Sequence, residues 1–181
     1  MKKNKLYSII TNPISITVFL LAILLVIGSH ITLAMDEGIW SYIGRVWSQN
    51  NIPPYIGAVE NKTPGIFWLY AISNFIFGNN IFFVRGLGII AILISSLTIY
   101  LIAKKLHSLL AGIFSMYVFG LTMTWRLMDG EYIAQTETFM ILFSILSFYL
   151  LIRGKNCDKW KYWTVLSGIS IGLAIAFKQI A

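Results

Sequence analysis

The chain has 181 residues, of which 57% are hydrophobic and only 12% are charged, and its mean hydropathy is +0.76. This composition excludes an ordinary soluble domain, and its continuous apolar blocks favour membrane helices over the alternating strands of a barrel. The net charge is +7, but the basic residues fall in short clusters between the apolar blocks. The positive charge therefore indicates membrane topology and not a nucleic-acid partner.

Five apolar blocks are predicted to cross the membrane as helices, at residues 14–34, 81–103, 109–125, 138–152 and 164–177. A shorter apolar block at residues 64–78 has the length of an interfacial or re-entrant helix. The stretch 38–49 (GIWSYIGRVWSQ) is predicted to form an amphipathic surface helix. We therefore expect an all-α, polytopic membrane protein with about five transmembrane helices plus external juxtamembrane helices.

The motif GISIG at residues 168–172 adds one packing prediction. Glycines four residues apart let two helix backbones approach each other in a membrane. We therefore expect close helix packing at this motif.

The basic residues predict the orientation of the chain. If the block 64–78 does not cross, the N-terminal lysines, the pair Lys104–Lys105 and the cluster 153–161 share one side. The positive-inside rule makes that side, with the N-terminus, cytoplasmic. Six of the seven acidic residues then lie outside, namely Asp36, Glu37, Glu60, Asp129, Glu131 and Glu137.

Three outer segments are expected to converge on one site: the pair Asp36–Glu37, Lys62 in the stretch 61–65, and the acidic stretch 129–139. Carboxylates suit general-base work on a hydroxyl, and a lysine suits a phosphate as a point charge. Together at a membrane surface they indicate a substrate with an anionic phosphate and a lipid tail.

Four motifs in order carry a family resemblance: the acidic pair 36–37, IPPY (52–55), NKTPGIFWLYAISNFIFG (61–78) and FFVRGLGIIA (82–91). They resemble the polyprenyl-phosphate-sugar transferases of the C-type glycosyltransferase fold. The nearest group is the bacterial relatives of protein O-mannosyltransferases and of lipid A aminoarabinose transferases. The resemblance covers about residues 36–181.

The resemblance implies catalytic roles for the acidic pair. Asp36 matches the base that takes the proton of the acceptor hydroxyl, and Glu37 is its neighbour, which orients the acceptor or tunes the base. Lys62 matches the lysine near the donor phosphate, although Thr63 separates it from the proline that follows directly in many relatives.

The resemblance also implies a set of supporting residues. Arg85 matches an arginine that enters the second membrane helix, and its role is structural or substrate-binding. Glu137 matches a second acidic residue, where several relatives have aspartate, and Lys178 matches a basic residue at the outer end of the fifth helix. Tyr55 completes the expected substrate-binding set.

The implied reaction is an inverting single displacement. The sugar leaves a polyprenyl-phosphate donor for a protein, lipid or glycan acceptor on the extracytoplasmic side of the plasma or inner membrane. No nucleotide or other cofactor is expected. The sequence holds no HxxxH or CxxC metal spacing, although some members of the wider fold use a divalent cation.

Residues 1–181 are expected to form one transmembrane domain of catalytic type, with its site in the external segment 35–80. Relatives are longer, so this domain is expected to be incomplete at its C-terminus and inactive alone, because later helices complete the donor pocket. The alternative is a non-catalytic membrane module or a transporter fragment whose external acids only set topology. A transporter more often places ionisable groups in the middle of its helices.

Overall fold

The computed structural model describes residues 12–30, 34–58, 60–78, 80–128, 133–155 and 158–179, without the side chains of residues 29 and 126–128. These residues form seven α-helices and no strand, which confirms the all-α prediction. The helices are α2 (Pro13–Ser29), α3 (Met35–Asn50), α4 (Pro64–Phe77), α5 (Ile81–Leu106), α6 (Leu109–Met128), α7 (Thr136–Gly154) and α8 (Trp160–Phe177).

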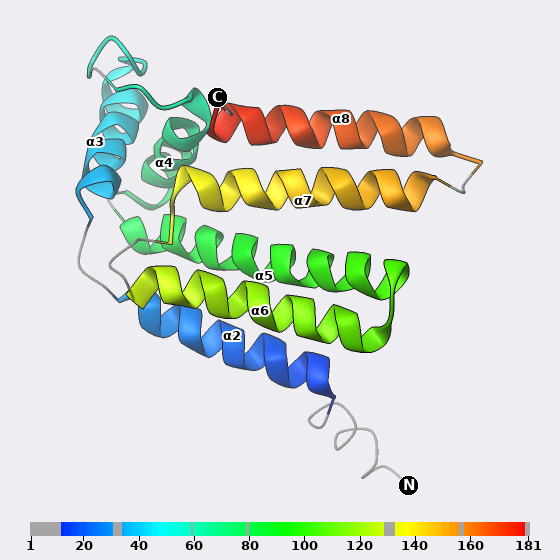
Figure 1. Cartoon of the computed structure of the whole chain (residues 1–181). Coiled ribbons are helices and arrows are strands. Elements are labelled where there is room, and N and C mark those ends of the chain that lie inside the picture. Colours follow the sequence, from blue (N-terminus) through cyan, green and yellow to red (C-terminus); the bar gives the residue numbers. More distant parts are fainter. Residues whose placement is uncertain are drawn as a thin grey trace, which may run out of the picture.

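Five helices form a bundle, and two lie across one of its ends (Figure 1). Helices α2, α5, α6, α7 and α8 run side by side, with α5 packed against both α6 and α7, and α7 against α8. Helices α3 and α4 pack against each other at the end where α5 and α7 begin and α8 finishes. The turns that join α5 to α6 and α7 to α8 lie at the opposite end.

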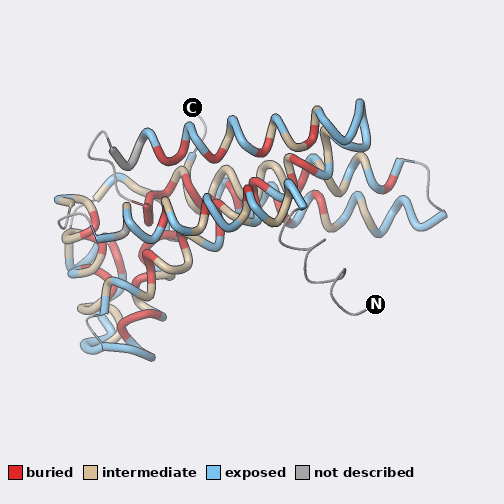
Figure 2. Tube along the Cα trace, turned by 90° about the horizontal axis from the view of Figure 1, so that it is seen from below, coloured by how far each residue is buried: buried red, intermediate tan, exposed pale blue. Residues whose placement is uncertain are grey.

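Three bundle helices are each long and apolar enough to cross a membrane: α5, α7 and α8. Helix α2 and the stretch Leu109–Trp125 of α6 are shorter apolar helices that lie alongside them. Figure 2 shows that exposed positions recur along every bundle helix. Large apolar side chains occupy many of them, including Phe19, Leu110, Phe114, Val165 and Ile169. An apolar outer surface is what a polytopic membrane protein presents to lipid, so this prediction is confirmed as well.

The first apolar block differs from its prediction. The expected helix 14–34 ends at Ser29, and a separate helix, α3, begins at Met35. Asp36 and Glu37 therefore lie in the first turn of α3, where carboxylates interact favourably with the positive end of the helix dipole. The surface helix predicted at residues 38–49 is longer in the structure, where it spans Met35–Asn50 and includes the acidic pair.

The short block 64–78 forms α4 as a separate 14-residue helix, in agreement with its interpretation as a helix outside the bundle. Thr63 and Pro64 begin it, because proline at the first position gives up no intrahelical hydrogen bond. Gly78 ends it with a φ of 65°, a left-handed conformation that glycine adopts without strain.

The packing prediction for the glycine motif 168–172 is wrong within the described chain. A Cβ atom built on Gly168 or Gly172 would have no heavy atom within 4 Å. Helix α8 instead packs on α7 through Ser167 and Ser170, which donate hydrogen bonds of 3.0 and 2.8 Å to backbone carbonyls of α7. The two glycines lie next to this face and not on it.

The close contact between α3 and α4 depends on Gly44. A Cβ atom there would lie 2.7 Å from the backbone carbon of Tyr70 and 2.8 Å from the backbone nitrogen of Ala71. Since both are backbone atoms, the two helices would have to separate.

We predict that Gly44→Ala lowers the unfolding free energy by about 1–3 kcal/mol through overpacking. The matched control is Gly86→Ala in α5, where a Cβ would meet nothing within 4 Å. It should be neutral or stabilising by up to about 1 kcal/mol, since alanine is the better helix former. Thermal unfolding of both variants in detergent measures the difference. Equal midpoints for the two variants would show that α3 and α4 are not in close contact.

Candidate functional site

The acidic pair lies where the chain turns into α3. Ala34 precedes the helix, and its backbone N–H donates a 3.4 Å hydrogen bond to Oε2 of Glu37. Successive residues of a helix project about 100° apart, so Asp36 and Glu37 point in different directions. Glu37 is fully buried, with 0% of its surface exposed, whereas Asp36 is half-buried.

Glu37 forms a buried ion pair with Arg85 of α5. Nε of Arg85 donates to Oε1 over 3.1 Å, and Nη2 donates to Oε2 over 2.6 Å. Two parallel bonds between a guanidinium and a carboxylate are strong and fix the relative orientation of both groups. The pair therefore ties the first turn of α3 to the beginning of α5, and it fixes the backbone that carries Asp36.

The phenol of Tyr70 lies beside this ion pair. Its hydroxyl is buried and has no hydrogen-bond partner among the described residues, and its ring meets Trp40 edge-on at 6.2 Å. Burial raises the pKa of Tyr70 above its ordinary value, and the nearby carboxylate of Glu37 raises it further. Tyr70 therefore stays neutral. No sequence signal distinguishes Tyr70, because a tyrosine in an apolar helix is typical of a membrane interface.

A small cleft brings two predicted site residues together. Its volume is about 180 Å³, and Asn61, Lys62, Thr63, Phe177, Lys178 and Gln179 line it. Lys62 precedes α4, and Lys178 follows α8, so the fold brings together cations that are far apart in the chain. The cleft lies between the positive end of the α4 dipole and the negative end of the α8 dipole, so the lysines and not the helix ends provide the attraction for an anion.

Contact between two helix ends holds the sides of this cleft together. A Cβ on Gly65 would lie 2.5 Å from the backbone oxygen of Ala176 and 3.2 Å from the backbone nitrogen of Phe177. The first turn of α4 therefore rests directly on the last turn of α8. The hydroxyl of Thr63 is buried at this junction without a hydrogen-bond partner in the described part of the chain.

Glu137 pairs with one of the two lysines. Its Oε1 accepts a hydrogen bond from Nζ of Lys178 at 2.5 Å, and its Oε2 accepts one of 2.7 Å from the hydroxyl of Thr136. The ammonium of Lys178 is therefore held at the N-terminal end of α7, next to the cleft.

Tyr55 supports the other lysine through its backbone. Its hydroxyl donates a 2.6 Å hydrogen bond to the carbonyl of Lys62, and its ring meets Phe67 edge-on at 5.7 Å. Its φ is 71°, a left-handed conformation that is uncommon for a bulky residue. Partial burial raises the pKa of the Tyr55 phenol, and the nearby carboxylate of Glu60 raises it further, so the donor proton is retained at neutral pH.

The structure therefore forms two clusters from the predicted residues. Glu37 and Arg85 form one, and Lys62, Lys178 and Glu137 gather at the cleft, with Tyr55 behind Lys62. Asp36 does not line the described cleft.

One hydrophobic cluster lies between α3, α4, α5 and α7, and it comprises Trp40, Ile43, Ile66, Phe67, Tyr70, Val84, Ala91, Ala134 and Phe139.

Some predictions have no test in the structure. Asp129 and Glu131 lie outside the described residues. In the part of the chain that is described, no three His, Cys, Asp or Glu side chains gather as a metal site would require. The catalytic and substrate-binding roles, and the cofactor prediction, therefore stay predictions.

Residues 61–181 match the family model described as dolichyl-phosphate-mannose-protein mannosyltransferase. The match covers more than half of the chain, so the chain belongs to this family and the resemblance seen in the sequence is confirmed. Membership assigns it the general activity of a membrane glycosyltransferase with polyprenyl-phosphate sugar donors. No curated protein and no solved structure gives a significant match.

We predict that Arg85→Met lowers the unfolding free energy by about 3–5 kcal/mol, because it leaves Glu37 buried without a counter-charge. The double variant Glu37→Gln/Arg85→Met should recover part of that loss, since no buried charge remains. Thermal unfolding in detergent measures both. Glu37→Gln alone completes the cycle, and a double variant whose loss equals the sum of the losses in Arg85→Met and Glu37→Gln would show that the pair makes no net interaction.

Proposed function

We propose that this member of the dolichyl-phosphate-mannose-protein mannosyltransferase family transfers a sugar from a polyprenyl phosphate to an acceptor hydroxyl, at the extracytoplasmic face of the plasma or inner membrane. The observation that supports the proposal is the cleft shared by Lys62 and Lys178. Two lysine ammonium groups, of which Lys178 is also paired with Glu137, suit a phosphate anion.

The leaving phosphate is the first requirement of the reaction. As the bond between the anomeric carbon and the phosphate oxygen breaks, the electron pair and the negative charge move onto the phosphate. Lys62 and Lys178 stabilise this charge where it develops, which is the most effective place for a cation. Glu137 and the phenol of Tyr55 act on these lysines and not on the sugar, since they contact Lys178 and the backbone of Lys62.

The acceptor hydroxyl is the second requirement. Asp36 takes its proton while the hydroxyl oxygen forms the new bond to the anomeric carbon, on the side opposite the phosphate. One displacement of this kind inverts the configuration of the sugar. Glu37 contributes as a positioning residue, because its pairing with Arg85 fixes the helical turn that presents Asp36.

The distribution of charge supports an external site. Six described lysines and arginines lie at the α5–α6 and α7–α8 turns, namely Lys104, Lys105, Arg153, Lys155, Lys159 and Lys161. Arg45, Lys62, Arg85 and Lys178 lie toward the other end. Nζ of Lys105 donates a 2.9 Å hydrogen bond to the carbonyl of Ile152, which places the ends of α5 and α7 side by side there. The positive-inside rule favours a cytoplasmic position for the end with more basic residues, which supports an external position for α3 and α4.

We predict that Asp36→Asn lowers sugar transfer by about 10²–10⁴-fold, because the amide preserves shape but accepts no proton. The assay uses membrane vesicles that carry the complete reading frame, with labelled polyprenyl-phosphate sugars. The control is Asp158→Asn, at the end of the bundle away from α3 and α4, which should transfer at the wild-type rate. Full transfer by Asp36→Asn, at equal expression and insertion, would remove Asp36 from the reaction.

We predict that Lys62→Gln lowers kcat/KM for the donor by about 10–100-fold, the value of one hydrogen bond to a charged group. Lys178→Gln should act similarly. Lys161→Gln, a surface lysine near the α7–α8 turn, is the matched control and should leave the constant unchanged. If all three variants behave alike, the cleft does not bind the donor phosphate.

A further inference from the structure

Helix α4 has an apolar outer face. Ile66, Phe67, Tyr70, Ser73 and Asn74 face the protein and are buried. The opposite face is exposed, and Trp68, Ile72, Phe75 and Ile76 make it up. The exposed fractions are 59% for Trp68 and 80% for Phe75, and no residue of α4 carries a formal charge. A helix without a polar face is not stable against water on either side, so something apolar covers the outer face.

Helix α3, its neighbour, has an ordinary amphipathic pattern. Trp40 and Ile43 are buried, Ser41 and Arg45 are half-buried, and Tyr42 and Gln49, which both carry polar atoms, are exposed. Water therefore suits the outer face of α3 and not that of α4. The line between the two helices divides a polar surface from an apolar one.

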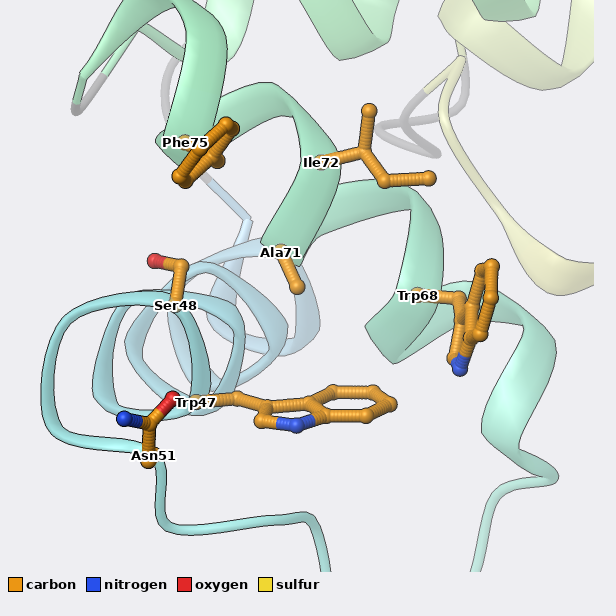
Figure 3. A pocket seen from close by; sticks show the side chains of 7 residues that line it. All are labelled: Trp47, Ser48, Asn51, Trp68, Ala71, Ile72 and Phe75. Atoms are coloured by element: carbon orange, nitrogen blue, oxygen red, sulfur yellow. The ribbon is translucent and has the colours of Figure 1, made fainter.

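A groove of about 340 Å³ follows this line (Figure 3). Trp68, Ala71, Ile72 and Phe75 of α4 form one side, and Trp47, Ser48 and Asn51 come from the end of α3. The rings of Trp47 and Trp68 meet edge-on, with their centroids 6.2 Å apart. None of the lining residues is charged, so the groove suits a hydrocarbon chain. Ser48 and Asn51 place polar atoms on the α3 side of the groove.

The connection of α4 to the membrane indicates what this hydrocarbon is. Only residues 78–80 separate α4 from α5, which is long and apolar enough to span the bilayer. Such a short link keeps α4 at the membrane surface. Phe77 and Phe82, on either side of the link, are both exposed and apolar, so the apolar surface of α4 continues onto the lipid-facing surface of α5. Tryptophan is also enriched at the level of the headgroups.

We propose that this groove binds an acyl chain of a bilayer lipid, so that α4 lies in the membrane interface while the outer face of α3 stays in water. The occupant is bulk lipid and not the sugar donor, and the proposal therefore does not depend on the proposed reaction. The proposal has a consequence for the cleft. Because Lys62 lies two residues before Pro64, the first residue of α4, the depth of α4 in the membrane sets the distance of this lysine from the hydrocarbon.

The test is tryptophan quenching in vesicles of brominated phosphatidylcholine. The full chain is prepared with Trp68 as its only tryptophan, the other five being replaced by phenylalanine. We expect strong loss of Trp68 fluorescence in brominated vesicles relative to unbrominated ones, and little quenching by iodide. A second preparation that keeps only Trp40, which is buried, should respond to neither quencher. In the Trp68 background, Ile72→Ser/Phe75→Ser should weaken quenching by bromine and strengthen quenching by iodide.

A second measurement avoids the multiple tryptophan replacements. Phe75→Cys, in a chain whose natural Cys157 is replaced by serine, carries an environment-sensitive fluorophore, and we expect its emission to shift to the blue on reconstitution.

Quenching of Trp68 by iodide but not by bromine would overturn the proposal. So would bromine quenching that added polyprenyl phosphate removes, because the donor would then be the occupant. Concentration-dependent disulfide dimers through unlabelled Phe75→Cys would also overturn it, by identifying a second copy as the cover.

Discussion

The ion pair between Glu37 and Arg85 is the contact that fixes α3 and α4 at one end of the bundle. Removing a carboxylate and a guanidinium from water is costly, and it is tolerated only where geometry is good and both groups are paired. Here two parallel bonds provide that geometry. The pair requires α3 to begin at a fixed place over α5, and everything that α3 carries takes its position from that constraint, including Asp36 at the preceding residue.

Helix α4 connects the two clusters. Its buried face, through Tyr70, lies beside the ion pair, and the residues that lead into its first turn, 61–63, form one wall of the lysine cleft. Gly44 and Gly65 allow this double role, since each lets a backbone of another helix approach where a side chain would stand. A 14-residue helix can in this way lie beside a buried carboxylate–guanidinium pair on one side and beside the lysine cleft at its N-terminal end, while its outer face stays apolar.

The bundle could be predicted from the sequence because transmembrane helices depend on local composition, which a single chain displays. The separate short helix 64–77 followed from its length in the same way. The end of α2 at Ser29 and the start of α3 at Met35 did not follow, because the block 14–34 holds no formal charge and its length suits a single span. The ion pair of Glu37 and Arg85 spans 48 residues without any local signature. The resemblance identified Lys62 and Lys178 singly, but only the packing of α4 on α8 shows that they share a cleft. The glycines at 168 and 172 mislead for a related reason, since spacing does not reveal which face of α8 meets α7.

The backbone contact between Gly65 and Ala176 has a mechanical consequence. Lys62 lies three residues before one partner of this contact, and Lys178 lies two residues after the other. The separation of the two ammonium-bearing segments is therefore set by main-chain atoms, which deform little, and not by the long side chains alone. A change of rotamer therefore moves either ammonium group but leaves the spacing of the two backbone segments unchanged.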